Sequence, residues 1–264
     1  SVTDRCNFRC QYCMPEEGMD WTPREDLLTF EEIERLAKLL VHRFGIESIR
    51  LTGGEPTVRA NLNKLIEKLA KLDVDLSLTT NGATLPLVAQ DLYEAGLNRI
   101  NISLDTLDPE RFKSLTRRDN LKQVLQGIEA AKAVGFDPVK INMVVMKGIN
   151  DDEVLDFISY GRENNVVVRF IEFMPLDADE VWEKSKVMSQ DEILALITPH
   201  YDLEPVFRGS SPAERWKFAD GSGEIGIIAT VSEAFCEACD RIRLTADGKF
   251  RNCLFAIKEF DIRT

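Results

Sequence analysis

Six cysteines in two groups of three constrain this 264-residue chain more than any other feature of its sequence. The first group consists of Cys6, Cys10 and Cys13, and the second of Cys236, Cys239 and Cys253. No basic segment followed by an apolar stretch indicates a secretory signal, so disulfides are disfavoured and a reducing compartment, the cytoplasm, is expected. We therefore interpret both groups as thiolate ligands of a metal.

The ligand count favours iron–sulfur clusters over zinc. Structural zinc normally takes four protein ligands, and the only two histidines, His42 and His200, lie near neither group in the sequence. A four-iron cluster that is held by three cysteines keeps one iron open to another ligand. The sequence therefore predicts two 4Fe-4S clusters, each with an open iron, and a zinc-stabilised interaction module is the alternative.

The charge balance restricts the partners that such a chain can have. There are 45 acidic and 33 basic side chains, which give a formal net charge of −12. Duplex nucleic acid and anionic membranes would be repelled, so neither is expected as a partner, and an anionic ligand needs a local basic pocket. The apolar runs are far shorter than the roughly 20 residues that cross a bilayer. The chain begins at Ser1 instead of Met, and we expect it to be a piece cut at both ends.

Between the cysteine groups, short β-branched runs alternate with longer helical patterns, which predicts an α/β fold with a parallel sheet. The predicted strands are 1–3, 48–51, 76–79, 99–104, 139–146 and 166–173. The predicted helices are 30–44, with a capping box at Thr29 and Glu32, 62–71, 85–95, 121–134, 151–164 capped by Asn150, and 190–200 capped by Ser189. Six strands and six helices favour an incomplete (β/α)6 TIM-like barrel over the closed barrel of eight units.

After about Tyr201 the pattern changes to short strands, predicted at 224–231, 241–245 and 250–254. The last two are joined by a turn at residues 246–248, and the second cysteine group lies in this segment. We therefore predict two parts, a partial barrel over residues 1–200 and a cluster-binding cap over residues 201–264.

Several predicted strands carry polar side chains on one face, because alternate residues of a strand point to opposite sides of a sheet. The polar residues that share this parity are Arg50, Ser77, Thr79, Asn101, Ser103, Lys140 and Asn142. A small closed barrel fills its interior with apolar side chains, so a polar inner face predicts an enlarged lumen that holds a polar ligand. The alternative is that these residues face solvent.

The spacing of the first group, C-x3-C-x2-C with Tyr12 before the third cysteine, resembles the signature of the radical S-adenosylmethionine (SAM) superfamily. The resemblance implies that the open iron chelates the amino and carboxylate groups of SAM and that reduction gives a 5′-deoxyadenosyl radical. Residues 52–56 (TGGEP) follow the predicted strand 48–51, where glycine allows close backbone approach. Alone they are only a turn, but beside this group they resemble the motif with which the superfamily holds the methionine amino group.

Longer matches narrow the resemblance to the molybdenum cofactor biosynthesis protein A family. They are residues 1–15 (SVTDRCNFRCQYCMP), 50–56 (RLTGGEP), 101–105 (NISLD), 140–142 (KIN), 169–174 (RFIEFM) and 235–248 (FCEACDRIRLTADG). The resemblance implies GTP 3′,8-cyclase activity, with an N-terminal radical cluster and a C-terminal auxiliary cluster whose open iron contacts the guanine. The implied product is 3′,8-cyclo-7,8-dihydroguanosine triphosphate, formed when the radical takes the C3′ hydrogen of the ribose and C3′ attacks C8.

The resemblance also assigns binding residues by motif position. Those implied for SAM are Tyr12, Gly53, Gly54, Glu55, Ser103 and Met174. Those implied for GTP are Arg50, Thr79, Lys140, Arg241 and Arg243. The strand parity independently places Arg50 and Lys140 on the polar face, where their charges could neutralise a triphosphate. No side chain is expected to break bonds itself, because the cofactor carries the hard chemistry.

The family pattern extends beyond this sequence at both ends. The resemblance implies an arginine that contacts GTP before the position of Ser1 and a tail ending in two glycines after that of Thr264, so the 264 residues alone lack two segments that it places in the active site. As partners, the resemblance implies a cyclic pyranopterin synthase that takes the product and an electron donor of unidentified kind, and a homodimer is a further expectation. The enzyme alternative is another radical enzyme with an auxiliary cluster, such as a peptide-modifying maturase.

Overall fold

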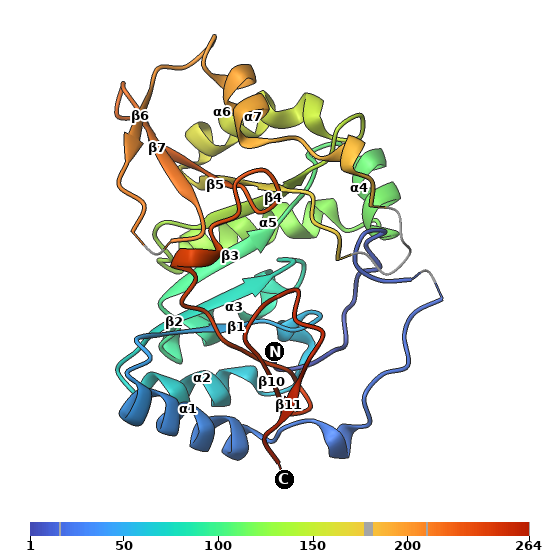
Figure 1. The fold of residues 1–264 in the computed structure, drawn as a ribbon, viewed down its shortest axis with the longest axis vertical. Helices are drawn as coiled ribbons and strands as arrows, with labels where there is room; N and C mark the ends of the chain where they lie inside the picture. The colour runs from blue at the N-terminus through green and yellow to red at the C-terminus, as the bar shows by residue number, and fades with distance from the viewer. Residues whose placement is uncertain (16, 177–181, 210, 264) are drawn as a thin grey trace.

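One eight-stranded sheet organises the structure, a computed structural model that describes residues 1–15, 17–176, 182–209 and 211–263 (Figure 1). Along the sheet the strands follow the order β1 (Ser48–Leu51), β2 (Asp75–Thr80), β3 (Arg99–Ser103), β4 (Lys140–Val145), β5 (Val167–Glu172), β8 (Glu224–Ile228), β7 (Glu214–Phe218) and β6 (Leu203–Val206). The first six in this order are mutually parallel, whereas β7 and β6 pair antiparallel. The predicted α/β fold with a partial barrel is confirmed.

The sixth parallel strand is not the one that the sequence suggested. Residues 1–3 form no strand; Val2 N donates to Thr52 O (2.7 Å), but the next partners lie in the Gly53-Gly54 turn, which offers no extended ladder. Strand β8 takes that place, beside β5. One sheet therefore runs across the boundary predicted at residues 200 and 201, and that division stays a prediction.

The helices cover the apolar face of the sheet. They are α1 (Phe30–Phe44), α2 (Leu62–Ala70), α3 (Leu85–Glu94), α4 (Pro109–Thr116), α5 (Leu121–Ala133), α6 (Val154–Asn164) and α7 (Gln190–Ile197). The capping box of α1 is present in both directions, as is one at Ser189 for α7, and α1 ends at Gly45 with a φ of 67°. Helix α5 confirms the helix predicted at 121–134 and buries Val124, Ile128 and Ala131 completely, along one stripe of its surface.

The start of α6 corrects a prediction. Residues Asp151–Glu153 form a 3-10 turn, and Asn150 makes no side-chain cap. Its side chain instead donates to Asp105 O (2.7 Å) and Val144 O (2.9 Å) and accepts from Met146 N (2.7 Å). The amide is used to join two loops, so it is not available to cap the helix.

Among the described residues, the α-helix and strands that were not predicted from the sequence are α4, β6, β7 and β11 (Phe260–Asp261). Helix α4 did carry a local signal, because Asp108 accepts from Arg111 N (2.7 Å) as its N-cap and Pro109 occupies its first position. Strands β6 and β7 pair only with each other and with β8, so their existence depends on contacts that a local pattern does not contain.

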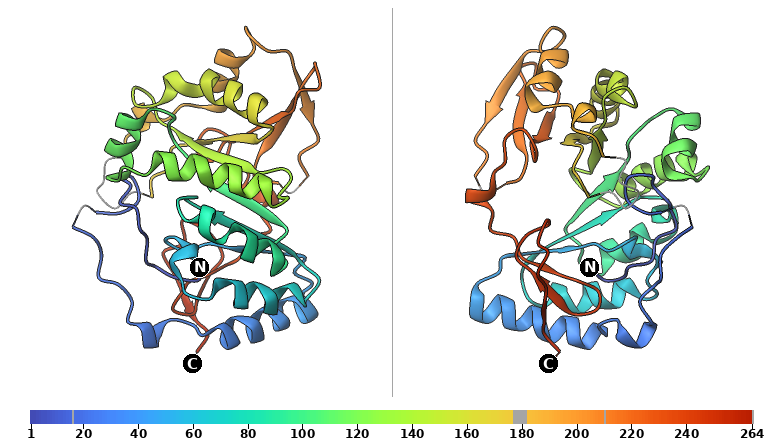
Figure 2. Two further views of the ribbon diagram at one scale, coloured as in Figure 1. Left: turned by 180° about the vertical axis from the view of Figure 1, so that it is seen from behind. Right: turned by 45° about the vertical axis from the view of Figure 1, so that its right-hand side comes forward.

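The C-terminal segment crosses the open side of the sheet. It contains a small antiparallel sheet of β9 (Arg243–Leu244), β10 (Lys249–Arg251) and β11, and the predicted turn between β9 and β10 ends at Gly248 with a φ of 89°. The two views in Figure 2 show the helices on one side of the large sheet and this segment on the other. Among the described residues, no helix is both long and apolar enough to span a bilayer.

Candidate functional site

The turn after β1 packs directly on the backbone that leads into the first cysteine group. Gly54 N donates to Thr3 O and Glu55 N to Arg5 O, both at 2.8 Å. A Cβ atom at Gly53 or Gly54 would lie 2.4 Å from a backbone oxygen, so only glycine fits. The close backbone approach that the two glycines allow is therefore used in part for a contact within the protein, between this turn and residues 3–5.

Glu55 is almost completely buried, and its carboxylate is fully engaged within the chain. One oxygen accepts from the amide and hydroxyl of Thr57 (3.1 and 2.6 Å) and from the hydroxyl of Thr80 (2.6 Å). The other accepts from Asn81 N at 2.6 Å. A carboxylate offers about four acceptor positions, and these four hydrogen bonds use them. Glu55 thereby joins the ends of β1 and β2. Its implied contact with SAM stays a prediction.

The first cysteine group lies on residues 6–14, which we call the cysteine loop. Cys6 and Cys10 pack partly against the core, whereas Cys13 is exposed. Protein atoms that keep water from the sulfurs raise the pKa of all three thiols, and the charges of Asp105, Cys13 and Cys6 raise the pKa of Cys10 further. The charges of the three thiols thus influence one another, although no three Cys, His, Asp or Glu side chains of the described residues converge as a site for one metal ion.

Tyr12 links the cysteine loop to the end of β3. Its hydroxyl donates to Asp105 Oδ2 at 2.5 Å, and Val144 N donates to the other carboxylate oxygen at 2.9 Å. Burial raises the pKa of Asp105 to about 6, although the two hydrogen bonds oppose the shift. The ring of Tyr12 also stands edge-on to Phe173, 6.4 Å between centroids. The loop is therefore anchored at the carboxyl ends of the strands.

A cavity of about 770 Å³ opens at the other end of the same strands. Its charged lining consists of Arg99, Lys140, Arg169, Arg215, Lys217 and Glu224. Arg215 pairs with Glu224 at 2.6 Å and Arg99 pairs with Asp75, whereas Lys140 and Arg169 have no carboxylate of the described residues within ion-pair distance. The predicted basic pocket inside an otherwise acidic protein is present.

The cations of the cavity lie close enough to destabilise one another. Burial, followed by the charges of Arg169 and Arg99, lowers the pKa of Lys140 to about 8. Burial, followed by Arg50 and Arg99, lowers the pKa of Arg169 to about 10. An anion bound among them would favour the charged forms.

Arg50 connects this cavity to the C-terminal segment. It donates from Nε to Ser77 Oγ at 3.3 Å, and partial burial followed by the charges of Arg99 and Arg241 lowers its pKa. Arg241 lies over the ring of Phe235, 5.0 Å from the centroid. Buried atoms of Arg241 (Nε) and Arg243 (Nη1) have no hydrogen-bond partner among the described residues. The charges of two predicted GTP residues, Arg50 and Arg241, from distant parts of the chain, thus influence each other.

The second cysteine group is more open. Cys236, Cys239 and Cys253 are all exposed, and Cys239 N donates to Cys236 O (3.2 Å) in a 3-10 turn, η5 (Cys236–Ala238). Arg241 donates to Cys239 Sγ at 3.3 Å, and its hydrogen bonds, the backbone one first, lower the pKa of that thiol. Cys253 follows β10 and accepts from Phe255 N (3.4 Å); no hydrogen bond joins it to the other two.

The remaining predicted site residues lie around the lumen. Ser103 ends β3, Thr79 lies in β2 beside Asn101, and Met174 follows β5; all three are half-buried. The sequence analysis missed Arg99, Arg169, Arg215 and Lys217 as cavity residues. Arg99 has the parity of Asn101 and Ser103, so that signal was available for it, whereas Arg215 and Lys217 lie on the unpredicted strand β7.

Comparison with known proteins matches both parts of the chain. Residues 1–161 match the Radical SAM superfamily, and residues 166–264 match Molybdenum Cofactor Synthesis C. The GTP 3′,8-cyclase of Streptomyces coelicolor is 49% identical over 268 residues, which cover 100% of this chain and 79% of that protein. The GTP 3′,8-cyclase of Rhodopirellula baltica is 48% identical over 270 residues, with coverages of 100% and 75%.

Solved structures share the fold at low identity. SuiB of Streptococcus suis bound to S-adenosylmethionine superposes with a TM-score of 0.71 at 13% identity, over 98% of this chain and 59% of that one. Methylornithine synthase superposes with a TM-score of 0.60 at 18% identity, over 74% of this chain and 59% of that one. This chain thus spans less than two thirds of each solved chain, and the likeness shows the fold alone.

Proposed function

The chain belongs to the radical SAM superfamily and, within it, to the family of GTP 3′,8-cyclases, and we propose that it converts GTP to 3′,8-cyclo-7,8-dihydroguanosine triphosphate. This is the first step of molybdenum cofactor biosynthesis. The superfamily implies a 4Fe-4S cluster and SAM. The observation that carries the choice of substrate is the cationic cavity in the lumen, lined by Lys140, Arg169 and Arg215.

Cys6, Cys10 and Cys13 would hold the first cluster. The donor set fits, because three thiols whose charges influence one another lie on one short loop, and each thiolate of a four-iron cluster binds a different iron, so the sulfurs need not converge on one ion. When bound and reduced, the cluster with SAM supplies the radical that takes a hydrogen atom from the substrate ribose. We place SAM against Tyr12, Gly53, Gly54, Ser103 and Met174, with Glu55 holding the turn.

The nucleotide would lie along the lumen, between the cysteine loop and the cationic cavity. Arg99 begins β3 and Asp105, which holds Tyr12, lies six residues further on, a span of about 20 Å at the rise of a strand. That length suits an extended nucleotide with its ribose toward the loop and its phosphates toward Lys140 and Arg169. Thr79 and Arg50 would line the path between them.

A second cluster at Cys236, Cys239 and Cys253 is part of the proposal. Its support is the donor set of three exposed thiols, of which Cys239 accepts from Arg241, together with the buried atoms of Arg241 and Arg243 that have no hydrogen-bond partner among the described residues. In this proposal those arginines and the open iron of the cluster hold the guanine end of GTP. Residues 1–200 would then form the radical part and residues 201–264 the cap that carries this cluster.

We also propose a pathway partner, a cellular compartment and an oligomeric state for the chain. The product would pass to a cyclic pyranopterin synthase, the chain would act in the cytoplasm, and it could pair as a homodimer. Their support is the family membership of the chain. A reduced iron–sulfur protein and exposed thiols are also the chemistry of a reducing compartment.

Anaerobic reconstitution with iron and sulfide tests the proposal. We expect about eight iron atoms and as many sulfides per chain, SAM cleavage on reduction, and GTP binding that guanosine does not match. Two zinc ions without sulfide would identify a zinc-stabilised module instead. SAM cleavage without GTP affinity would favour a peptide-modifying enzyme, which needs no site for a triphosphate.

A further inference from the structure

The cysteine loop lacks regular secondary structure, so its backbone polar groups need partners from elsewhere in the chain. The carboxyl end of α4 supplies them. Arg9 N donates to Thr116 O and Gln11 N to Leu115 O, both at 3.0 Å. The last carbonyls of a helix have no partner within the helix, so the helix end and the loop amides satisfy each other.

Two arginines that follow α4 satisfy the loop carbonyls. Arg118 Nε donates to Asn7 O at 3.0 Å. Arg117 Nη1 lies 3.3 Å from Arg9 O and 3.2 Å from Met14 O, and donates to both. Below them, the rings of Phe8 and Phe112 meet edge to face, 5.8 Å between centroids, and both residues are buried. The loop is thus held by hydrogen bonds in both directions and by an apolar contact.

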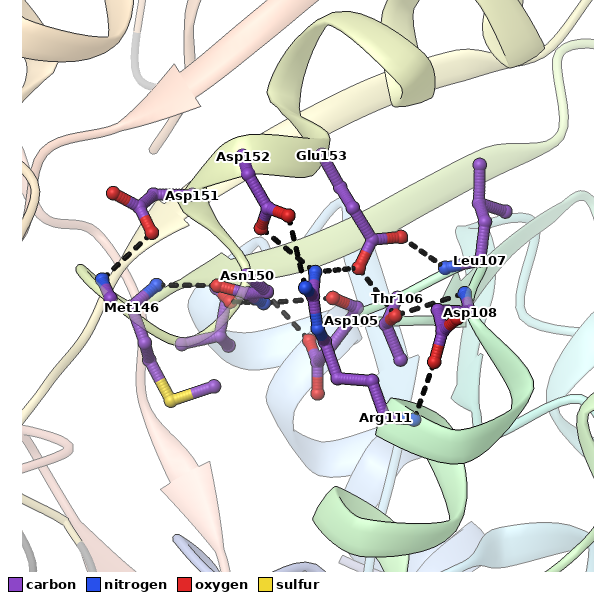
Figure 3. A network of polar contacts seen from close by, with 12 residues as sticks. Asp105, Thr106, Leu107, Asp108, Arg111, Met146, Asn150, Asp151, Asp152 and Glu153 are labelled. Carbon is purple, nitrogen blue, oxygen red and sulfur yellow. Dashed lines mark hydrogen bonds and ion pairs between the residues drawn. The ribbon is translucent and has the colours of Figure 1, made fainter.

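The other end of α4 is fixed by the polar network in Figure 3. Arg111 of α4 donates to Asp152 (2.8 Å) and to the buried carboxylate of Glu153. Glu153 in turn accepts from Leu107 N at 2.6 Å and from the hydroxyl of Thr106. The helix therefore cannot shift along its axis without breaking a buried charged contact.

These contacts close a ring. It runs from the cysteine loop through Tyr12 to Asp105 at the end of β3, on through Thr106 and Glu153 to Arg111, and along α4 back to the loop. Ser103, which we place against SAM, lies two residues before Asp105. The loop and the SAM-binding strand end are thus tied to one rigid helix.

We propose that α4 positions the cysteine loop, and that Arg117 and Arg118 are positioning residues for the first iron–sulfur cluster. This inference rests on the proposed cluster at Cys6, Cys10 and Cys13. Without the arginines, loop carbonyls next to all three cysteines lose their partners within the chain, and the three thiolates lose the spacing that the cluster requires. In this proposal the arginines act through the carbonyls of the loop, so their effect on the cluster is indirect.

The test compares variants in a background where Cys236, Cys239 and Cys253 are serine, so that only the first cluster contributes to the spectra. For Arg118→Ala we expect the cluster to be lost to a chelator at least about tenfold faster, the factor of one charged hydrogen bond. In Arg118→Ala, the lines of the electron paramagnetic resonance spectrum recorded with SAM should also be broader than in the parent. Arg118→Gln keeps an N–H donor, so its rate of cluster loss should lie between those of the parent and of Arg118→Ala.

Arg117→Gly separates positioning from folding. Arg117 has a φ of 55°, in the left-handed region that favours glycine, so the backbone gain offsets part of the lost hydrogen bonds. The cluster-free variant should therefore still fold, yet should lose the cluster faster. Arg43→Ala, at an exposed site on α1, is the matched control and should behave as the parent. Parental cluster retention and SAM response in both Arg118→Ala and Arg117→Gly would overturn the inference. A parent background that assembles no cluster would instead overturn the proposed function, and the inference with it.

Discussion

The carboxylate of Glu55 accepts a hydrogen bond of 2.6 Å from the hydroxyl of Thr80, 25 residues further along the chain. The bond joins the turn after β1 to the last residue of β2, next to the cysteine loop. The same carboxylate also accepts from Thr57 and Asn81. The glutamate of the Gly-Gly-Glu turn therefore stabilises the contact between the ends of the two strands.

Replacing Glu55 by Gln should therefore destabilise the protein even without any cofactor. An amide keeps one acceptor oxygen and turns an NH2 group toward donors, so we expect the free energy of unfolding to fall by about 2–3 kcal/mol. Urea unfolding of the cluster-free protein measures it, with exposed Glu17→Gln as the control. Unchanged cluster-free stability together with weakened SAM binding would mean that Glu55 acts on the SAM ammonium group alone.

Serine substitutions at the two cysteine groups should give different losses. Each proposed cluster has three thiolates and no other cysteine is present, so nothing replaces a lost ligand. Cys10→Ser should abolish SAM cleavage, whereas Cys239→Ser should keep some cleavage and lose cyclisation of GTP. Product analysis by chromatography distinguishes the two. Normal turnover by Cys239→Ser would show that the second cluster is not essential.

Lys140→Ala should weaken GTP binding by roughly ten- to a hundredfold, because a charged hydrogen bond to phosphate contributes about 1.5–3 kcal/mol. SAM binding, which relies on the other end of the lumen, should be nearly unchanged. Equilibrium dialysis of GTP and guanosine against the reconstituted protein measures this, and the exposed Lys122→Ala is the matched control. Unaltered GTP binding by Lys140→Ala would make Lys140 a solvated strand residue.

GTP binding should also weaken as the pH rises above about 8. The pKa of Lys140 is lowered to about 8 by burial and by Arg169 and Arg99, so the empty site loses this charge in that range. A bound polyphosphate raises that pKa, so binding takes up a proton and its affinity falls by up to about tenfold per pH unit. Dialysis between pH 7 and 9.5 tests it, and Lys140→Met should flatten the profile; an equally steep profile in Lys140→Met would assign the proton to another group.

The lowered pKa of Lys140 also determines the direction in which the stability of the empty protein changes with pH. The folded pKa of Lys140 lies below its usual 10.5, so between about pH 8 and 10.5 the unfolded chain binds more protons than the folded one. The contribution of Lys140 to the stability of the empty protein therefore rises with pH across that window. Bound GTP should reduce this rise.

Local patterns predicted those parts of the molecule that depend on neighbouring residues. The capping box of α1, its end at Gly45 and the buried stripe of α5 were all predictable, because each involves residues within a few positions of one another. The alternation of Lys140 and Asn142 with buried Ile141 and Met143 likewise revealed the inner face of β4. Asn150 was wrong as a helix cap because a distant partner, Asp105, takes its side chain.

By itself, then, the sequence determined the two cysteine groups, the α/β order and the polar face of the strands, since spacing and periodicity are properties of short segments. Only the tertiary structure decided that β8 and β7 complete the sheet and bring Arg215 beside Arg99 and Lys140. It alone decided that the end of α4, about a hundred residues further along the chain, holds the cysteine loop. Such contacts form where orphaned backbone groups and buried charges find partners in space, and no local pattern records which distant segment will supply them.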